Sequence, residues 1–428
     1  MGGGLVQLAA YGSQDIYLTT NPEITYFKAV YRRYTNFAME SIHQVVEGNI
    51  DFGGNITVVI SRNGDLVGNI TLQLHLFDPK PFIQNSDSFD YCGWIQGVGN
   101  YIVNNANINI GGSQIDQQYG KWMDIWSELN LSTSQLDGYG TMTGKNYSSA
   151  IWQPYDVTTE PDNLLSIPLT FWFCRNPGLA IPLIALQYHE VRLQVQFEKF
   201  TNLVVGVKGG EYQKIIQNPL KVLPGFSNRF SVWNTYYFLD TTERRKFAQN
   251  AHEYLIEQVQ TQAGNLTSID ELSFIRLNLN HPTKELIFVL NRNNSNAPQN
   301  DFSQGVNVIP NGTPKQFSPL DVFTFTVNGT DRFKERPGEY FRLNQNYDHH
   351  TRIPGNYIYC YSFALRPEDH QPSGTCNFAR IDSSQLMFKL RNTNVLQNYN
   401  SVPSYSLYAP CYNILRIMSG MGGLAFAN

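Results

Sequence analysis

Apolar and polar residues alternate along several segments of the chain. The pattern is clear at Ile70–Leu76, where every second residue is Ile or Leu, and it recurs at Val191–Phe197, Ile275–Leu279, Phe323–Val327 and Leu386–Leu390. A period of two gives a strand one apolar and one polar face. Antiparallel sandwiches need such strands, whereas strands of parallel sheets are apolar on both faces. The pattern therefore predicts an all-β protein built from antiparallel β-sandwiches.

Turn and helix signals fit the same fold. Asn63-Gly64, Gly111-Gly112 and Asn328-Gly329 lie beside alternating runs and supply the positive φ of tight hairpins. Helix signals are few. The spacing of apolar residues from Trp122 to Leu129 predicts a helix packed on a sheet edge. Thr242 is the expected cap of a second, short helix through Glu243–Gln249.

The two halves of the chain resemble one another. Ile108-x-Ile110-Gly111-Gly112, followed by Asp116 and Trp122, is similar to Phe325-x-Val327-Asn328-Gly329, followed by Asp331 and Phe333. Phe173-Cys174-Arg175-Asn176-Pro177 and the strand after it are similar to Phe363-Ala364-Leu365-Arg366-Pro367 and the strand after that. The repeat predicts one β-sandwich used twice, with a boundary near Leu239-Asp240-Thr241.

Three long segments between the alternating runs are rich in Asn, Ser, Gly and Pro. They are Pro79–Asn100, Ser132–Asp162 and Asn291–Pro319. We expect them to be loops that cap a sandwich at one end.

Composition excludes several classes of protein. With 428 residues the chain is too long for one ordinary all-β domain, and 42% hydrophobic residues supply ample core. The net charge is only −4, and Lys and Arg are scattered. The one dense basic group, Arg244-Arg245-Lys246, is expected on a solvated helix face. A nucleic-acid footprint would need a basic stripe, so we expect no direct nucleic-acid binding.

Cysteine usage and hydropathy predict a soluble protein made in the cytoplasm. The five cysteines form no C-x-x-C pair, and the chain has no signal peptide, so we expect reduced, mostly buried thiols. The most apolar long stretch, Leu164–Tyr188, contains Pro168, Pro177 and Pro182. It therefore cannot be a membrane helix, and no membrane insertion is expected.

No short motif supports catalysis, a cofactor or a metal. Residues 140–146 resemble a phosphate loop but have Tyr139 and Asn146 where that motif needs Gly and Ser or Thr. His189-Glu190 and His252-Glu253 begin like zinc-protease motifs, yet both lack the second histidine. The adjacent pair His349-His350 would diverge on a strand. We expect no catalytic, cofactor-binding or metal residue.

Eight Asn-x-Ser/Thr sequons are present, at Asn55, Asn69, Asn130, Asn146, Asn265, Asn293, Asn311 and Asn328. In an Asn-rich chain many such matches arise by chance. The candidates for N-linked glycans are Asn293, Asn311 and Asn146, which lie in the long polar segments.

Segments from one end of the chain to the other resemble a known family. They include YFKAVYRRYTNFAMESI (26–42), IPLIALQYHEVRL (181–193), FLDTTERRKFAQNAHEYLIEQ (238–258), QPSGTCNFARID (371–382) and YNILRIMSGMGGLAFAN (412–428). They are similar to the major capsid proteins of nucleocytoplasmic large DNA viruses, especially those of chlorella viruses and related algal viruses. The three long loop segments match least well.

The resemblance implies two consecutive eight-stranded jelly rolls, at residues 26–240 and 241–428, after an N-terminal arm at residues 1–25. Three chains would form a capsomer of pseudo-hexagonal outline that tiles an icosahedral shell around an internal membrane. The arm would run beneath the shell toward neighbouring capsomers or minor capsid proteins. The long loops would point outward and carry glycans attached outside the secretory pathway. The protein would be assembled in the host cytoplasm and reside in the virion.

Alternatives remain at this point. A less abundant capsid paralogue at special shell positions would have the same fold. A carbohydrate-binding β-sandwich would use aromatic residues of the loops, namely Tyr91, Trp94, Tyr139, Tyr147 and Trp152. The aromatic and basic residues of Tyr26–Tyr34 are either interface residues or the first strand of the core.

Overall fold

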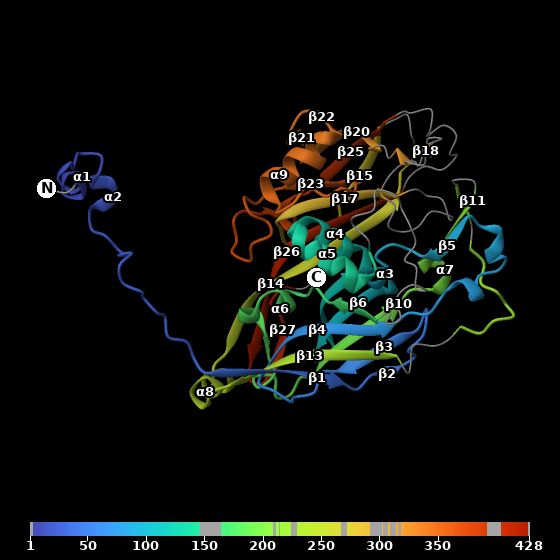
Figure 1. The fold of residues 1–428 in the computed structure, drawn as a ribbon, viewed down its shortest axis with the longest axis horizontal. Coiled ribbons are helices and arrows are strands. Elements are labelled where there is room, and N and C mark those ends of the chain that lie inside the picture. Colours follow the sequence, from blue (N-terminus) through green and yellow to red (C-terminus); the bar gives the residue numbers. More distant parts are fainter. Residues whose placement is uncertain are drawn as a thin grey trace. The chain divides into compact units, whose positions relative to one another are not determined.

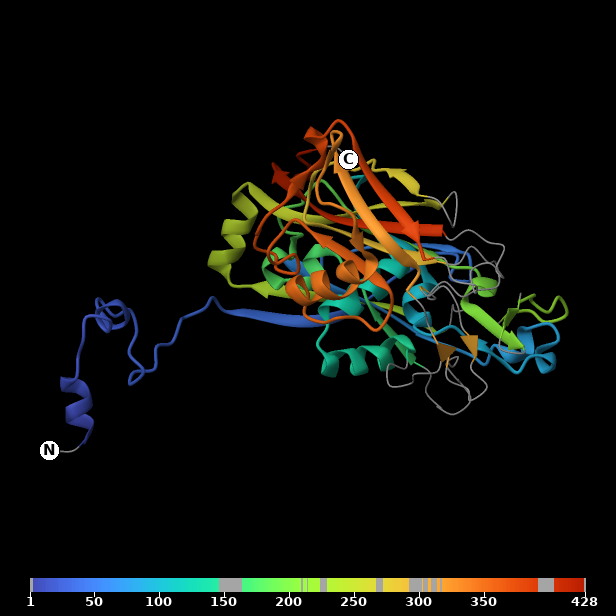
Figure 2. The ribbon, with the colours of Figure 1, turned by 90° about the horizontal axis from the view of Figure 1, so that it is seen from above.

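The structure, a computed structural model, describes residues 3–145, 164–208, 211–213, 215–223, 229–266, 272–291, 302, 307–308, 314–315, 318–391 and 404–426. They form two units, Met1–Asn36 and Phe37–Asn428. The second unit holds both sandwiches (Figures 1 and 2).

The first unit consists of two short helices and extended chain. The helices are α1 (Gly3–Ala9) and α2 (Ile16–Thr19), and neither has a buried residue. Tyr26–Tyr34 forms no strand, and Tyr26, Phe27 and Tyr31 are about nine-tenths exposed. The alternative that this segment is the first strand of the core is therefore wrong.

The first sandwich lies between Phe37 and Leu239 and has two antiparallel sheets. One sheet has the order β1-β13-β4-β8, with β9 beside β4: β1 (Phe37–Gln44), β13 (Phe230–Leu239), β4 (Leu66–His75), β8 (Leu164–Pro168) and β9 (Ile181–Pro182). The other has the order β2-β3-β10-β6-β7: β2 (Glu47–Gly48), β3 (Asn55–Val59), β10 (Val191–Phe197), β6 (Val103–Ile110) and β7 (Ser113–Tyr119).

The second sandwich lies between His252 and Leu424. One sheet joins β23-β17-β26-β16-β24, with β14 and β27 also paired to β26: β14 (His252–Asn265), β16 (Pro282–Thr283), β17 (Glu285–Asn291), β23 (Ile358–Ser362), β24 (Cys376–Asn377), β26 (Ser404–Met418) and β27 (Met421–Leu424). The other joins β15-β25-β20-β21, with β22 beside β20: β15 (Ser273–Arg276), β20 (Leu320–Val327), β21 (Thr330–Asp331), β22 (Arg336–Pro337) and β25 (Ser384–Leu390).

Both sandwiches have the same topology. When the principal strands of each are counted along the chain, the sheets have the orders 1-8-3-6 and 2-7-4-5 in both halves. This order defines a jelly roll, in which successive strands alternate between the two sheets except at strands 4 and 5, which form a hairpin within one sheet. The β6–β7 hairpin corresponds to the β20–β21 hairpin, which confirms the repeat seen at Gly111-Gly112 and Asn328-Gly329. The prediction of two antiparallel jelly rolls is confirmed.

The alternating strands have the burial that their sequences predict. Along β10, Val191, Leu193, Val195 and Phe197 are buried, whereas the polar residues between them are exposed. β17 differs, because all of its residues from Glu285 to Asn291 are buried. It lies between β23 and β26 with material on both faces, which is why its sequence is nearly continuously apolar.

All three predicted loops contain short helices or strands. Pro79–Asn100 includes η1 (Lys80–Phe82), η2 (Ser86–Ser88), β5 (Tyr91–Trp94) and the start of α3 (Val98–Ile102). Strand β5 forms a small sheet with β11 (Val204–Lys208) and β12 (Glu211–Gln213). Ser132 begins α5 (Thr133–Thr143) with a capping box to Gln135. These segments were predicted as loops because their polar composition masked short elements.

The remaining short elements are α4 (Gly120–Asn130), α6 (Trp172–Arg175), η3 (Pro177–Leu179), α7 (Phe200–Leu203), the β18–β19 pair (Asn307–Val308, Pro314–Lys315), η4 (Tyr340–Asn344), α9 (Gln345–His349) and η5 (Phe378–Arg380). Helix α8 (Thr241–Gln249) connects the two sandwiches. Its N-cap is Asp240 and not Thr242, whose hydroxyl donates to the Asp240 carboxylate at 2.8 Å. Arg244, Arg245 and Lys246 are exposed on it as predicted.

Candidate assembly surfaces

Helix α4 joins the two sandwiches. Trp122, Ile125, Trp126 and Leu129 lie on the predicted helix and pack in the core of the second sandwich, where the sequence had indicated only a sheet edge. The ring of Trp122 lies 5.4 Å from that of Tyr408 on β26. The two tryptophans are at most 4% exposed. A helix of one jelly roll therefore supplies part of the core of the other, so the two sandwiches form a continuous packed body.

A buried ionic cluster crosses the same junction. Glu257 on β14 contacts Arg175 at 2.9 Å, Lys284 at 2.9 Å and His370 at 3.6 Å. Arg175 belongs to the first sandwich, and its guanidinium also lies over the ring of Trp126. Burial raises the pKa of the Glu257 carboxyl, but Arg175, His370 and Lys284 outweigh burial and bring that pKa to about 2. Glu257 is therefore ionised at neutral pH.

A second cluster lies nearby around Glu128 of α4. Its carboxylate accepts from Lys145 at 2.7 Å and from Arg352 of the second sandwich. Lys145 also contacts Asp124 at 2.7 Å. Burial raises the pKa of Glu128, but the two cations outweigh burial and lower it. Together the clusters fix the angle between the sandwiches, because charged groups without water require their partners in place.

The C-terminal hairpin of β26 and β27 fastens the second sandwich to the first. Gly422 packs on Leu186 and Ile110, and the Nδ1 of His189 lies 3.0 Å from the Gly422 carbonyl oxygen. The turn uses Gly420 at φ +81°, where a Cβ would stand 2.6 Å from the ring of Tyr188. The Gly-rich C-terminal segment is thus a tight turn held against the first sandwich.

We expect Gly420→Ala to lower the free energy of unfolding by about 1–2 kcal/mol, because an L-residue is strained in the left-handed region and its Cβ meets Tyr188. Gly423→Ala is the matched control, since nothing lies within 4 Å of its Cβ position and its φ is not positive. Thermal unfolding of the two variants measures the difference. Equal midpoints would contradict the assignment of the turn.

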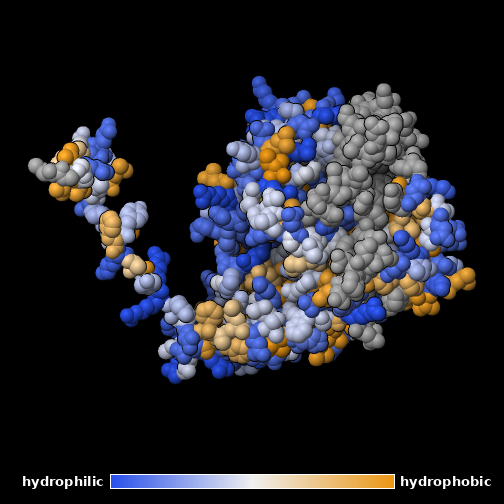
Figure 3. Space-filling view, in the orientation of Figure 1, coloured by the Kyte–Doolittle hydropathy of each residue, from blue (hydrophilic) through white to orange (hydrophobic). Residues whose placement is uncertain are grey.

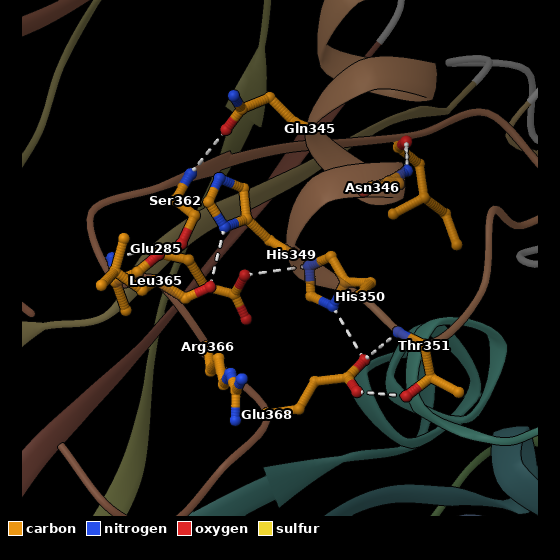
Figure 4. Close-up of polar contacts among 12 residues, drawn as sticks. Glu285, Gln345, Asn346, His349, His350, Thr351, Ser362, Leu365, Arg366 and Glu368 are labelled. Carbon is orange, nitrogen blue, oxygen red and sulfur yellow. Dashed lines mark hydrogen bonds and ion pairs between the residues drawn. The ribbon is translucent and has the colours of Figure 1, made fainter. Parts of the chain in front are cut away.

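The imidazole of His350 lies between two carboxylates inside the second sandwich (Figure 4). Its Nδ1 is 3.0 Å from Glu368, and its Nε2 is 3.0 Å from Glu285 on β17. The contact with Glu285 is an ion pair without hydrogen-bond alignment. Burial lowers the pKa of His350, but Glu285 and Cys360 together outweigh burial, so that pKa lies well above its usual value. The surroundings of His350 therefore favour the imidazolium form of its ring.

The predicted pair His349-His350 does diverge, although it ends a helix and does not lie on a strand. The ring of His349 points to the carbonyl oxygen of Leu365, whereas the ring of His350 lies between Glu285 and Glu368 (Figure 4). Among the described residues no group of three His, Cys, Asp or Glu side chains is placed to hold a metal ion. All five cysteines are buried or half-buried and unpaired, as predicted.

Other predicted candidates have definite places. The Nε2 of His252 donates to the carbonyl oxygen of Phe247 at 2.8 Å, in the last turn of α8. Trp94 is fully buried and donates to the carbonyl of Phe77, so it cannot be a sugar-stacking platform, and Tyr139 is only 9% exposed. Tyr147, Trp152 and the glycan candidates Asn146, Asn293 and Asn311 lie outside the described residues. In the part of the chain that is described, no helix is long and apolar enough to cross a membrane.

Exposed apolar side chains are spread over the second unit. Figure 3 shows them scattered among polar side chains on the face that it draws. Among them Val45, Leu343, Tyr347 and Leu365 are between 40% and 76% exposed. Single exposed apolar residues are ordinary, whereas groups of them mark contact surfaces.

The charged residues of the junction were missed by sequence reasoning. Glu257 and Arg175 occupy polar positions next to apolar ones, and alternation alone does not show whether a polar face meets water or another domain. The sequence did contain one signal for Arg175. This residue lies in a segment that repeats in the second half, and there the apolar Leu365 takes the place of the charged Arg175.

Comparison with known proteins agrees with the fold. Two sequence families match: "Major capsid protein N-terminus" at residues 25–240, and "Large eukaryotic DNA virus major capsid protein" at residues 243–423. The major capsid protein of Pyramimonas orientalis virus is 40% identical, and that of Paramecium bursaria Chlorella virus 1 is 38% identical; each alignment covers 100% of both chains.

Solved structures show the same architecture. A chain of the PBCV-1 virus capsid superposes with a TM-score of 0.75 at 34% identity, covering 94% of this chain and 100% of that one. The Faustovirus major capsid protein superposes with a TM-score of 0.70 at 12% identity, which shows the shared fold. The fold is thus that of a double jelly-roll viral capsid protein. The chain belongs to the large eukaryotic DNA virus major capsid protein family, and its role is structural.

Proposed function

We propose that three copies of the chain associate into a capsomer of pseudo-hexagonal outline, and that capsomers tile the icosahedral outer shell of a large double-stranded DNA virus. The observation that carries the proposal is the equal topology of the two sandwiches. Three chains with two similar sandwiches each place six similar bodies around one threefold axis, and closed cyclic symmetry is the usual solution for identical subunits.

Sedimentation velocity of the purified protein at micromolar concentration tests the capsomer. The expected species has three times the mass of the chain. A compact monomer over the whole concentration range would contradict the proposal.

The N-terminal unit supports a second part of the proposal, contact beneath the shell with neighbouring capsomers or minor capsid proteins. Its aromatic side chains at Tyr26, Phe27, Tyr31 and Tyr34 are at least 84% exposed, and such groups are buried where a partner covers them. Removal of residues 1–36 is expected to leave the capsomer intact and to stop capsomers from assembling into shells. A truncated chain that still builds complete shells would contradict this role.

Three further features belong to the same proposal. Assembly takes place in the host cytoplasm, and N-linked glycans are attached to outward segments that include Asn146, Asn293 and Asn311. The chain is the abundant shell subunit and not a paralogue at special positions, which copy number per virion decides. A sugar-binding role has less support, because Trp94 is buried in the core.

A further inference from the structure

The junction inside the chain joins two unlike surfaces. The first sandwich contributes strand β7 and helices α4 and α6, and the second contributes strands β14 and β26. The carboxylate of Asp116 accepts from the backbone N–H of Val259 at 3.4 Å, and Arg175 pairs with Glu257. A contact between two unlike surfaces is a head-to-tail contact. The first sandwich therefore still has its own equivalent of the surface that the second contributes, and the second still has its equivalent of the surface that the first contributes.

Strands β1 and β13 of the first sandwich correspond to β14 and β26 of the second. Ile42 pairs with Asn234, and Ile256 pairs with Asn413. Two residues further on, a glutamine side chain in each strand accepts a hydrogen bond from the neighbouring strand: Gln44 from Tyr236, and Gln258 from Asn413. The register therefore makes three equivalent pairs: His43 with Glu257, Val45 with Val259, and Trp233 with Tyr412.

These equivalent positions differ sharply in exposure. Glu257 and Val259 are 4% and 9% exposed because the first sandwich covers them. Val45 is 74% exposed, and His43 is exposed too. The ring of His43 stands edge-on to Trp233 at 5.5 Å, so the three side chains form one aromatic and apolar surface. We call His43, Val45 and Trp233 the β1 surface.

The second sandwich has counterparts of α4 and α6. Helix α4 follows the β6–β7 hairpin, and the helical segment η4–α9 follows the corresponding hairpin β20–β21. The segment with Arg175 follows β8, and its repeat with Leu365 follows the corresponding strand β23. In the first sandwich these elements are buried in the junction. In the second they expose Leu343 (40%), Tyr347 (76%) and Leu365 (75%).

These three side chains form the second surface, which we call the α9 surface. His349 links its two segments through the carbonyl oxygen of Leu365 (Figure 4). Figure 1 shows β1 and β13 at one end of the second unit, and α9 at the opposite end, beyond the second sandwich. The two unused surfaces therefore lie toward opposite ends of the second unit, away from the internal junction.

We infer that the internal junction is repeated between copies, with the α9 surface of one chain packed on the β1 surface of the next. The occupant of each surface is a second copy of this chain. At the position where the internal junction has the ion pair Arg175–Glu257, the contact between copies joins Leu365 to His43, an apolar contact. Repeated three times, the contact closes a ring of six sandwiches, so the inference rests on the proposed trimer.

Charge variants at this contact test the inference. His43→Glu with Leu365→Glu places like charges across it, and we expect the apparent association to weaken by about 100-fold or more. His43→Glu with Leu365→Arg recreates the internal ion pair between copies, and we expect it to restore a trimer. Both double variants contain H43E and differ only at position 365. A comparison of their association by sedimentation velocity therefore isolates the effect of the sign of the charge at that position.

Two controls separate the possible failures. Leu220→Glu, at a position that is 88% exposed and outside both surfaces, is expected to leave the trimer unchanged. Thermal unfolding confirms that each variant is folded. A Glu/Glu variant that remains trimeric like the wild type would overturn the inference and leave the capsomer standing. A wild-type protein that is monomeric would overturn the capsomer itself.

Discussion

Replacement of Glu257 by Ala is expected to lower the free energy of unfolding by about 3–5 kcal/mol. The side chain of Lys284 is 1% exposed and depends on Glu257 for its counter-charge, as does Arg175 across the junction. Removal of the carboxylate leaves these cations in the interior without a partner, which costs far more than the loss of a surface ion pair.

Glu253→Ala is the matched control for this variant. Glu253 lies on the same strand and pairs with Arg416, but both side chains are more than half exposed, so the expected change is below about 1 kcal/mol. Chemical denaturation followed by tryptophan fluorescence measures both, since Trp122 and Trp126 lie at the junction. Equal destabilisation by the two substitutions would contradict the role of the buried cluster.

The carboxylate of Glu257 also makes the stability of the protein depend on pH in the acid range. Its pKa is about 2 in the folded protein and about 4.5 when unfolded, so its stabilising effect is complete above pH 4.5 and is lost as the pH falls toward 2. A shift of this size corresponds to about 3 kcal/mol. The wild type is expected to lose this stability between pH 4.5 and 2, and Glu257→Ala is expected to have a flatter profile there.

The alternation pattern predicted the strands wherever one face of a strand is buried and the other is exposed to solvent. Val191–Phe197 is such a case, and its exposure alternates as expected. The repeat at Gly111-Gly112 and Asn328-Gly329 also gave the duplicated topology, because tight hairpins need residues that tolerate positive φ. Local chemistry suffices for features of this kind.

The alternation pattern failed where the other sandwich covers the polar face of a strand. Gln258 is 4% exposed although it is polar and lies on an alternating strand, because the first sandwich packs on β14. Helix α4 was predicted correctly, yet its partner was not, since a helical stripe shows that a face is buried but not what buries it. The buried His350 is the strongest example, because its two carboxylates are 65 residues behind it and 18 ahead in the sequence. Such contacts come from tertiary structure and leave no local signal.

His350 gives the second large expected effect, and it lies at alkaline pH. The pKa of His350 is raised in the folded protein, so the stability that it contributes is complete below its unfolded pKa of about 6.5 and is lost as the pH rises through the folded value. The groups that face the ring are Glu285, Glu368 and the thiol of Cys360. Deprotonation of His350 leaves Glu285, which is fully buried, without a cation.

We therefore expect His350→Gln to lower the free energy of unfolding near pH 6 by about 3–5 kcal/mol, because the amide cannot neutralise Glu285. The variant is also expected to lose part of the fall in stability that the wild type shows above neutral pH. His349→Gln is the control, since its amide can still donate to the carbonyl oxygen of Leu365 and the side chain contacts neither carboxylate. Thermal unfolding from pH 6 to 10 compares the three proteins. If the stabilities of His350→Gln and of the wild type fall in parallel over that range, the imidazolium is not the group whose titration destabilises the second sandwich.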